Sequence, residues 1–284
     1  MSTRDPAQEY ATGLQGQLVH TLLAHGIQVQ PGGIERHPKM VRLFILPAAG
    51  TRHQAVLGLH REITAGLGLD CQVKSDRRGL YVDADLPSRY WRTLSFAGML
   101  QKAMAIAGAA PRLQVPALLG LDEDGRIVFA DLASATTPHT LLAGTTGSGK
   151  TNLLKGIILS LAAMNRPSRV QVFILDAKGY AFPPLAGLPH VQAVAAEPNA
   201  WLEQAAHVLV AMEERLKARE RHNGVHLVLV VDELVDLLMT DQERTGGGLA
   251  EALIRLTQKG REVGVHLIAA TQKPSARVVN SLIT

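Results

Sequence analysis

Apolar residues in the first 110 positions follow short helical and alternating patterns. Within residues 1–30, leucines recur at helical spacing, at Leu14, Leu18, Leu22 and Leu23. A Pro-Gly-Gly stretch at 31–33 then interrupts the helical pattern. Beyond it, the spacing predicts helices at 55–67 and 91–107 and strands at 41–46 and 80–85. The sequence therefore predicts an N-terminal helical segment over residues 1–34 and a small α+β domain over residues 35–110.

From about Leu118, short apolar runs alternate with helical stretches, which is typical of repeated βα units around a parallel sheet. The predicted strands lie at 140–143, 170–175, 227–231 and 265–270. The predicted helices lie at 152–163, along a face formed by Trp201, Ala205, Val208, Met212 and Leu216, and along Leu249, Leu253 and Leu256. Five successive apolar residues at 227–231 indicate a strand covered on both faces. We therefore expect an α/β domain with a mostly parallel sheet over residues 111–284.

Composition places the chain among packed proteins. Of its 284 residues, 46% are hydrophobic and 19% are charged, which excludes a disordered chain. Cys71 is the single cysteine, so no internal disulfide can form and a reducing, cytoplasmic location is expected. The polar N-terminus lacks a signal-peptide core, and no apolar run reaches 18 residues, so the chain as given is not expected to span a membrane.

The net charge of +4 is only mildly basic. The surplus lies between Glu35 and Arg92, where ten Lys and Arg face six Asp and Glu. A basic segment is compatible with a polyanionic partner, but on charge alone a solvated surface is the better interpretation.

Residues 144–151 read GTTGSGKT and match the phosphate-binding pattern G-x-x-x-x-G-K-S/T between a predicted strand and a predicted helix. Glycines let consecutive backbone N–H groups turn inward towards phosphate, and the helix N-terminus adds a positive dipole. Lys150 is expected to reach the β- and γ-phosphates, and the Thr151 hydroxyl to bind Mg²⁺. The alternative is a chance Gly-rich turn, which the strand–loop–helix context disfavours. The predicted nucleotide-binding residues are Gly144, Thr145, Thr146, Gly147, Ser148, Gly149, Lys150, Thr151 and Asn152.

Residues 227–233 read LVLVVDE, an apolar strand that ends in two acids. Downstream of a phosphate loop this is a Walker B pattern, in which Asp232 binds Mg²⁺ and Glu233 acts as the general base for water. The alternative is a strand end that meets solvent. Thr271 and Gln272 end the next strand, where a polar residue can orient water or sense the γ-phosphate, and Gln272 is the predicted nucleotide contact. The alternative is a simple strand cap. Because no Asn-Lys-x-Asp motif is present, ATP is favoured over GTP.

Five segments together resemble the FtsK/SpoIIIE-type DNA translocase family. They are HTLLAGTTGSGKT (139–151), FILDAKG (173–179), GLPHV (187–191), VLVVDELVDLLMT (228–240) and LIRLTQKGREVGVHLIAATQKPS (253–275). The stretch 42–87 is similar to the smaller domain that precedes the motor core in that family. The resemblance implies a RecA-like P-loop ATPase core in a hexameric ring that threads double-stranded DNA, with ATP between subunits.

The resemblance also suggests roles for individual residues. Arg261 corresponds to an arginine finger that acts on the neighbouring subunit's nucleotide, although on its own it reads as a solvated helix residue. Lys178, in DAKG, matches the family's DPKG, with Ala177 in place of proline. Lys273 corresponds to a basic pore-loop position of the family, and Arg277 lies nearby. Both are candidates for contact with DNA phosphates, or they belong to a solvated loop.

Several functions fit these features. The first is an ATP-driven DNA pump for chromosome segregation or DNA transfer, with conjugative and HerA-like motors sharing parts of the pattern. The second is a scaffold subunit that binds ATP without productive turnover. A small-molecule kinase is disfavoured because Glu233 and Arg261 suit ring hydrolysis. Family motors continue past the position of Thr284, so a fragment or a short form is expected.

Overall fold

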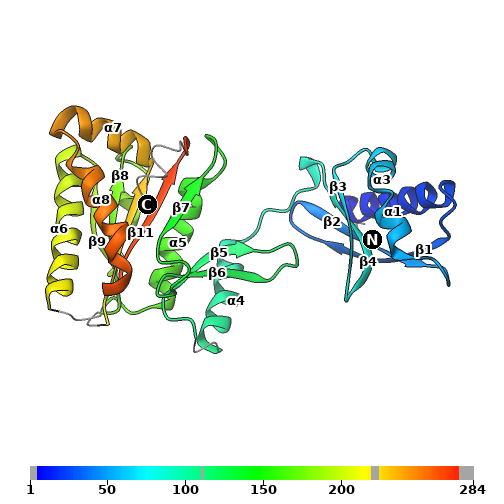
Figure 1. Ribbon diagram of the computed structural model, residues 1–284, viewed down its shortest axis with the longest axis horizontal. Coiled ribbons are helices and arrows are strands. Elements are labelled where there is room, and N and C mark those ends of the chain that lie inside the picture. The colour runs from blue at the N-terminus through cyan, green and yellow to red at the C-terminus, as the bar shows by residue number, and fades with distance from the viewer. Residues whose placement is uncertain (1–4, 110–111, 219–223, 275–284) are drawn as a thin grey trace. The chain divides into compact units, whose positions relative to one another are not determined.

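A computed structural model describes residues 5–109, 112–218 and 224–274. The chain forms two compact units (Figure 1). The first comprises Met1–Ser95 with Glu123–Gly125, and the second comprises Phe96–Asp122 with Arg126–Thr284. The observed division thus falls near residue 95, whereas the sequence placed boundaries at 34 and 110.

The first unit packs helices on an antiparallel sheet whose strand order is β1-β2-β4-β3. Its helical elements are α1 (Pro6–Ala24), α2 (His53–Leu57), α3 (His60–Leu67) and the short η1 (Ser88–Tyr90). Its strands are β1 (Val29–Arg36), β2 (Met40–Pro47), β3 (Cys71–Asp76) and β4 (Gly79–Asp85). Helix α1 begins at Pro6 because Asp5 caps it by accepting from the Ala7 N–H. Leu14, Leu18 and Leu22 are buried as predicted, but Leu23 is exposed.

Strand β1 was not predicted, because its Pro-Gly-Gly stretch reads as a breaker. The strand bulges between Pro31 and Ile34. Gly32 lies against β2 so closely that an added Cβ would meet the Phe44 carbonyl oxygen at 2.9 Å. The buried Gln15 amide donates to the carbonyls of Gly32 and Phe44, which satisfies backbone groups at the bulge. The breaker residues therefore shape the strand rather than end it. The predicted helix at 55–67 is likewise divided, into α2 and α3.

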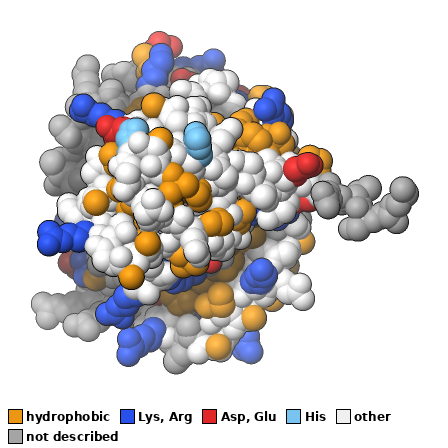
Figure 2. All heavy atoms as spheres, turned by 90° about the vertical axis from the view of Figure 1, so that its right-hand side faces the viewer, with side chains coloured by type: hydrophobic (Ala, Val, Ile, Leu, Met, Phe, Trp, Pro, Cys, Tyr) orange, Lys and Arg blue, Asp and Glu red, His pale blue; other side chains and the backbone are white. Residues whose placement is uncertain are grey.

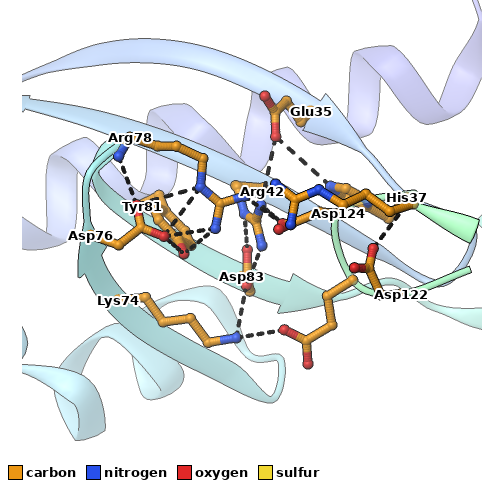
Figure 3. Close-up of polar contacts among 12 residues, drawn as sticks. Glu35, His37, Arg42, Lys74, Asp76, Arg78, Tyr81, Asp83, Asp122 and Asp124 are labelled. Atoms are coloured by element: carbon orange, nitrogen blue, oxygen red, sulfur yellow. Dashed lines mark hydrogen bonds and ion pairs between the residues drawn. The ribbon is translucent and has the colours of Figure 1, made fainter. Parts of the chain in front are cut away.

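A buried ionic cluster joins β2, β3 and β4 in this unit (Figure 3). Arg42 is 1% exposed, donates to both carboxylate oxygens of Asp83 and stacks over the Tyr81 ring. It also donates to Asp124, which accepts from Arg78 as well. Hydrogen bonds to Asp83 raise the pKa of Arg42, so the guanidinium stays charged. Because Arg42 and Asp83 are both buried, removing either of them would leave a buried charge without its bidentate partner, which favours a single arrangement of the pair.

The second unit is built on a five-stranded, all-parallel sheet whose order is β7-β11-β10-β8-β9 (Figure 1). These strands are β7 (Thr140–Ala143), β8 (Val170–Asp176), β9 (Val191–Ala195), β10 (His226–Asp232) and β11 (Val265–Thr271). The helices are α4 (Phe96–Ala109), α5 (Lys150–Met164), α6 (Pro198–Lys217), α7 (Leu234–Thr245) and α8 (Gly248–Lys259), with short turns η2 (Pro183–Leu185) and η3 (Gly260–Val263). An antiparallel hairpin consists of β5 (Pro116–Leu121) and β6 (Ile127–Asp131).

Both faces of the parallel sheet are covered, which confirms the α/β prediction. Alternate residues of β10 divide between the two cores: Leu229 packs towards α6 and α8, and Val228 and Val230 pack towards α5 and the β5–β6 hairpin. Every residue of β10 and β11 is buried. Strand β9, the hairpin and α7 were not predicted, because their short apolar runs lack a clear period. No helix in the described ranges is long and apolar enough to cross a membrane.

Candidate functional site

The phosphate loop follows β7 at the carboxyl edge of the sheet and leads directly into α5. Gly147 and Gly149 adopt φ values of 77° and 95°, which a side chain would oppose. A Cβ at Gly144 would meet the Ser148 hydroxyl at 2.7 Å, so a larger residue here would require that side chain to move. The two left-handed glycines turn the backbone so that α5 starts at Lys150 with its N-terminus at the loop. This local geometry suits the binding of an anion such as phosphate.

Lys150 folds back into its own loop. Its ammonium group donates to the carbonyl oxygens of Gly144 at 2.6 Å and Thr145 at 2.9 Å. The two carbonyl oxygens accept hydrogen bonds from the ammonium group, as the oxygens of a bound phosphate would. A bound triphosphate would have to exchange with them, and the lysine lies within reach to do so.

A pocket of about 220 Å³ brings the predicted nucleotide, metal and base residues together. It is lined by Thr146, Gly147, Gly149, Lys150, Thr151, Asn152, Lys178, Asp232, Glu233 and Gln272. Gly144, Thr145 and Ser148 shape the loop but do not line the pocket. A larger cavity, of about 750 Å³, lies at the opposite edge of the sheet near Arg169 and His226 and contains none of the predicted residues.

Asp232 ends β10 opposite the first turn of α5. It is 2% exposed, and the Thr151 hydroxyl donates to its carboxylate at 3.3 Å. Adjacent ligands in an octahedral Mg²⁺ shell lie roughly 2.9 Å apart, which follows from metal–oxygen distances of about 2.0–2.1 Å. A hydroxyl and a carboxylate at this separation are hard oxygen donors of the kind that Mg²⁺ prefers, so the pair fits the metal that the motif implies.

Burial raises the pKa of Asp232, while the Lys178 ammonium opposes this effect and Asp176 adds to it. A raised pKa means that the folded protein binds a proton more readily than the unfolded chain. Stability attributable to this group is therefore lost as the pH rises above the unfolded value near 3.8. At neutral pH the ionised carboxylate destabilises the fold.

Replacing Asp232 by asparagine is therefore expected to raise the Tm of the metal-free protein at pH 7 and to abolish Mg²⁺-dependent stabilisation by ATP. The gain in Tm should shrink as the pH is lowered towards the ordinary pKa of aspartate, because the wild-type carboxyl, whose pKa is raised, then takes up a proton. Thermal unfolding at several pH values measures both effects. A Tm of the variant below that of the wild type at pH 7 would contradict the assignment.

Glu233 has an unusual backbone conformation. Its φ of 61° is the one positive value at a non-glycine residue among the described residues, and such a conformation costs on the order of 1–3 kcal/mol. The left-handed turn ends β10 and starts α7 immediately afterwards. The side chain is 4% exposed overall and lines the pocket, where its Oε1 accepts from the Gln272 N–H at 3.0 Å and from the Thr271 hydroxyl at 3.4 Å.

Gln272 connects the end of β11 with the phosphate loop. Its side-chain oxygen accepts from the Thr146 hydroxyl, and its backbone N–H donates to Glu233. The residue predicted to contact nucleotide thus bridges the loop and the candidate base.

Lys178 is a pocket residue that the sequence placed in a family-like segment without assigning it a role. It follows β8, the strand beside β10, so its position after the strand end is the signal that would have found it. The buried Asp176 holds the connection by accepting from the backbone N–H groups of Lys178, Ala181 and Phe182. This anchor directs an exposed ammonium group towards the same pocket as Asp232.

Two other predicted residues lie apart from the pocket of their own chain. Arg261 is exposed on η3, before the amino end of β11, so the length of a seven-residue strand, roughly 20 Å, separates it from the pocket. Lys273 is exposed just beyond the carboxyl end of β11. Arg277 lies outside the described residues.

Comparisons with known proteins place these features in a family. The FtsK/SpoIIIE family model matches residues 107–223 and 216–276. The protein named DNA translocase FtsK in Lactiplantibacillus plantarum is 30% identical over an aligned length of 308 residues. This alignment covers 98% of this chain and 38% of the relative. The DNA translocase SftA of Bacillus subtilis is 28% identical, over 93% of this chain and 29% of the relative. The chain thus spans less than two fifths of the length of these relatives.

Solved structures share the fold. The pCW3 conjugation coupling protein TcpA, in its monomer form with ATPγS, aligns with 95% of this chain and 80% of its own, with a TM-score of 0.55 and 15% identity. At this identity the likeness shows the fold alone. The cytoplasmic domain of the type VII secretion ATPase EccC of Thermomonospora curvata aligns with 61% of this chain and 23% of its own, with a TM-score of 0.51 and 28% identity.

Proposed function

The chain belongs to the FtsK/SpoIIIE family, and we propose that it is the ATPase motor of a double-stranded DNA translocase. The observation that carries this proposal is the single pocket in which the phosphate loop, the Thr151–Asp232 pair and Glu233 meet. ATP hydrolysis needs all three, whereas nucleotide binding alone needs only the loop. The relatives named DNA translocases, at 28–30% identity, support DNA as the cargo.

In the proposed reaction, the loop N–H groups and Lys150 bind the triphosphate. Thr151 and Asp232 would hold Mg²⁺, which neutralises phosphate charge. Glu233 orients a water molecule, accepts its proton as the water oxygen bonds to the γ-phosphorus, and the bond to the β-phosphate oxygen breaks to release ADP. Lys178 supplies a further positive charge to the same pocket.

A ring of subunits, taken as a hexamer from the family resemblance, would complete this site. Among the described residues, no arginine lines the pocket of one chain, and Arg261 lies a strand length from its own pocket. This separation supports a role for Arg261 at a nucleotide held by another copy. In a head-to-tail ring, the same exposed guanidinium would meet the neighbour's γ-phosphate, which is the geometry of an arginine finger supplied in trans.

Arg261→Ala is expected to lower turnover by roughly 10³-fold or more in uniform rings, in line with other arginine fingers. Mixing it with the Lys150→Ala variant should restore part of the activity, because some interfaces then pair an intact pocket with an intact Arg261. Turnover is measured across mixing ratios, and Arg255→Ala, a change to an exposed arginine on α8, serves as the control. If no mixture has more turnover than the sum expected from the two variants measured separately, a trans role is excluded.

Contact with DNA is proposed through Lys273, with Arg277 as a second candidate beyond the described residues. Such contacts are made to phosphates and are independent of base sequence. Figure 2 shows one face of the molecule, on which Lys and Arg side chains are scattered towards the rim and do not form one continuous patch. That face therefore offers no continuous basic surface for DNA, and the proposed contact rests on the exposed Lys273.

We place the protein in the cytoplasm, where its lone thiol would remain reduced. Burial raises the pKa of Cys71 to about 11, and the nearby Asp70 and Asp85 add to this effect. The thiol is therefore protonated at neutral pH and chemically inert. Chromosome segregation and DNA transfer remain the two proposed settings for the motor.

The deciding experiment is ATPase activity with and without duplex DNA, together with the particle mass in solution. A motor should be stimulated by duplex DNA of any sequence, less so at high salt, and the active particle should have the mass of a ring. A scaffold subunit would bind ATP and remain indifferent to DNA. Turnover that duplex DNA does not change would overturn the proposed function.

A further inference from the structure

One hydroxyl group connects the candidate base with the candidate DNA contact. Thr271 is the last residue of β11 and is fully buried. Its hydroxyl donates to Glu233 Oε1 at 3.4 Å and accepts from the Lys273 backbone N–H at 3.2 Å. Two hydrogen bonds therefore lead from the backbone of Lys273 to the carboxylate that would activate water.

The chemistry of a hydroxyl makes this path directional. A hydroxyl has a single proton, so it can donate to Glu233 only while its lone pairs face elsewhere. The Lys273 N–H binds one of those lone pairs and thereby fixes the orientation of the proton. The Gln272 N–H is the second donor to the same Glu233 oxygen, at 3.0 Å. Together the two donors hold one oxygen of the carboxylate of Glu233, a residue that lines the pocket.

We propose that Thr271 is a positioning residue that transmits DNA contact at Lys273 to the carboxylate of Glu233. The DNA part rests on the proposed function, whereas the positioning part rests on the hydrogen bonds alone. When phosphate holds Lys273, its N–H stays on the Thr271 hydroxyl and Glu233 stays in place. When Lys273 is displaced, the hydroxyl rotates and Glu233 loses one of its two donors.

The same three-residue segment also contacts the phosphate loop. The Gln272 side chain accepts from the Thr146 hydroxyl while its backbone holds Glu233. A change in the loop on nucleotide binding and a change at Lys273 on DNA binding therefore act on the same short segment. Thr271 lies at its start, where the buried strand fixes one end.

The test compares Thr271→Val, which removes the hydroxyl at constant shape, with Thr271→Ser, which keeps it. With duplex DNA present, kcat of the valine variant is expected to fall by about fivefold, the factor for one lost hydrogen bond. Without DNA, kcat should fall by a smaller factor, so that DNA stimulation largely disappears. KM for ATP and the affinity for DNA should not change, and serine should restore all values. Thr257→Val, which removes a hydroxyl on α8, is the matched control.

Two results would overturn the proposal: wild-type kcat and stimulation in the valine variant, or a serine variant that behaves like valine. Thermal unfolding and KM report whether each variant is folded, and Thr271→Ala provides a second variant without the hydroxyl. If duplex DNA does not stimulate the wild type, the proposed function fails separately. The DNA-free kcat then still decides the positioning role, which requires a loss in valine that serine repairs.

Discussion

Replacing Glu233 by glutamine is expected to lower ATP turnover by roughly 10²–10⁴-fold, the usual contribution of a general base, while ATP binding is retained. Glutamine has the same shape as glutamate. Its carbonyl oxygen can still accept from the Gln272 N–H and the Thr271 hydroxyl, so the left-handed turn and the start of α7 should persist. What is lost is the ability to accept a proton from water.

The measurement for this variant is a pair of values, the turnover rate and the affinity for a fluorescent ATP analogue with Mg²⁺. Glu251→Gln is a suitable control, because Glu251 is exposed on α8 and lies outside the pocket. Turnover within about threefold of the wild type would remove Glu233 from the role of base, since a base contributes at least 10²-fold. A parallel loss of ATP affinity would instead indicate that glutamine distorts the pocket.

Much of the second unit could be predicted from sequence because its strands are buried on both faces. The run at 227–231 is continuously apolar and the run at 265–270 is apolar except for His266, and both form inner strands of the parallel sheet. The candidate site follows from the same logic. Parallel strands end at one edge, so residues after β7, β10 and β11 must meet there. The phosphate loop, Asp232 and Glu233 were located by their motifs, and Gln272 by its place at the end of the next predicted strand.

What the sequence did not reveal depends on close contacts between distant segments. Strand β1 contains a Pro-Gly-Gly stretch, and only the approach of Phe44 and the amide of Gln15 explains why the strand survives. Lys178 enters the pocket because Asp176 anchors the turn after β8, and a buried aspartate at a strand end has no periodic signature. The left-handed conformation of Glu233 is likewise invisible, since glutamate rarely adopts it.

The hydrogen bonds of Thr271 illustrate the same limit at the site itself. A polar residue at the end of a strand predicts a contact with nucleotide or a simple cap, and either interpretation fits the sequence. In the structure the Thr271 hydroxyl donates to the carboxylate of Glu233, which follows β10, and accepts from the backbone N–H of Lys273. Such a partner depends on the register between β10 and β11, which no single strand encodes.

Lys150→Ala is expected to lower turnover by roughly 10²-fold or more. A fixed positive charge, placed where negative charge develops in the transition state, contributes on that order. Unlike Glu233→Gln, it should also weaken ATP binding, since the ammonium meets phosphate in the ground state as well. Its present partners, the carbonyls of Gly144 and Thr145, lie in a largely exposed loop, so water can replace it and the Tm should change little.

The control for this second variant is Lys155→Ala, which removes a lysine from the same helix one turn further on, outside the pocket. Turnover, ATP-analogue affinity and Tm are measured for both. An unchanged affinity with lost turnover would mean that Lys150 acts only in the transition state, and wild-type turnover would exclude its phosphate role. The two pocket variants are thus distinguished by binding: the loss of Lys150 should weaken the affinity for ATP, whereas the loss of the Glu233 carboxylate should leave a pocket that fills with ATP and does not turn over.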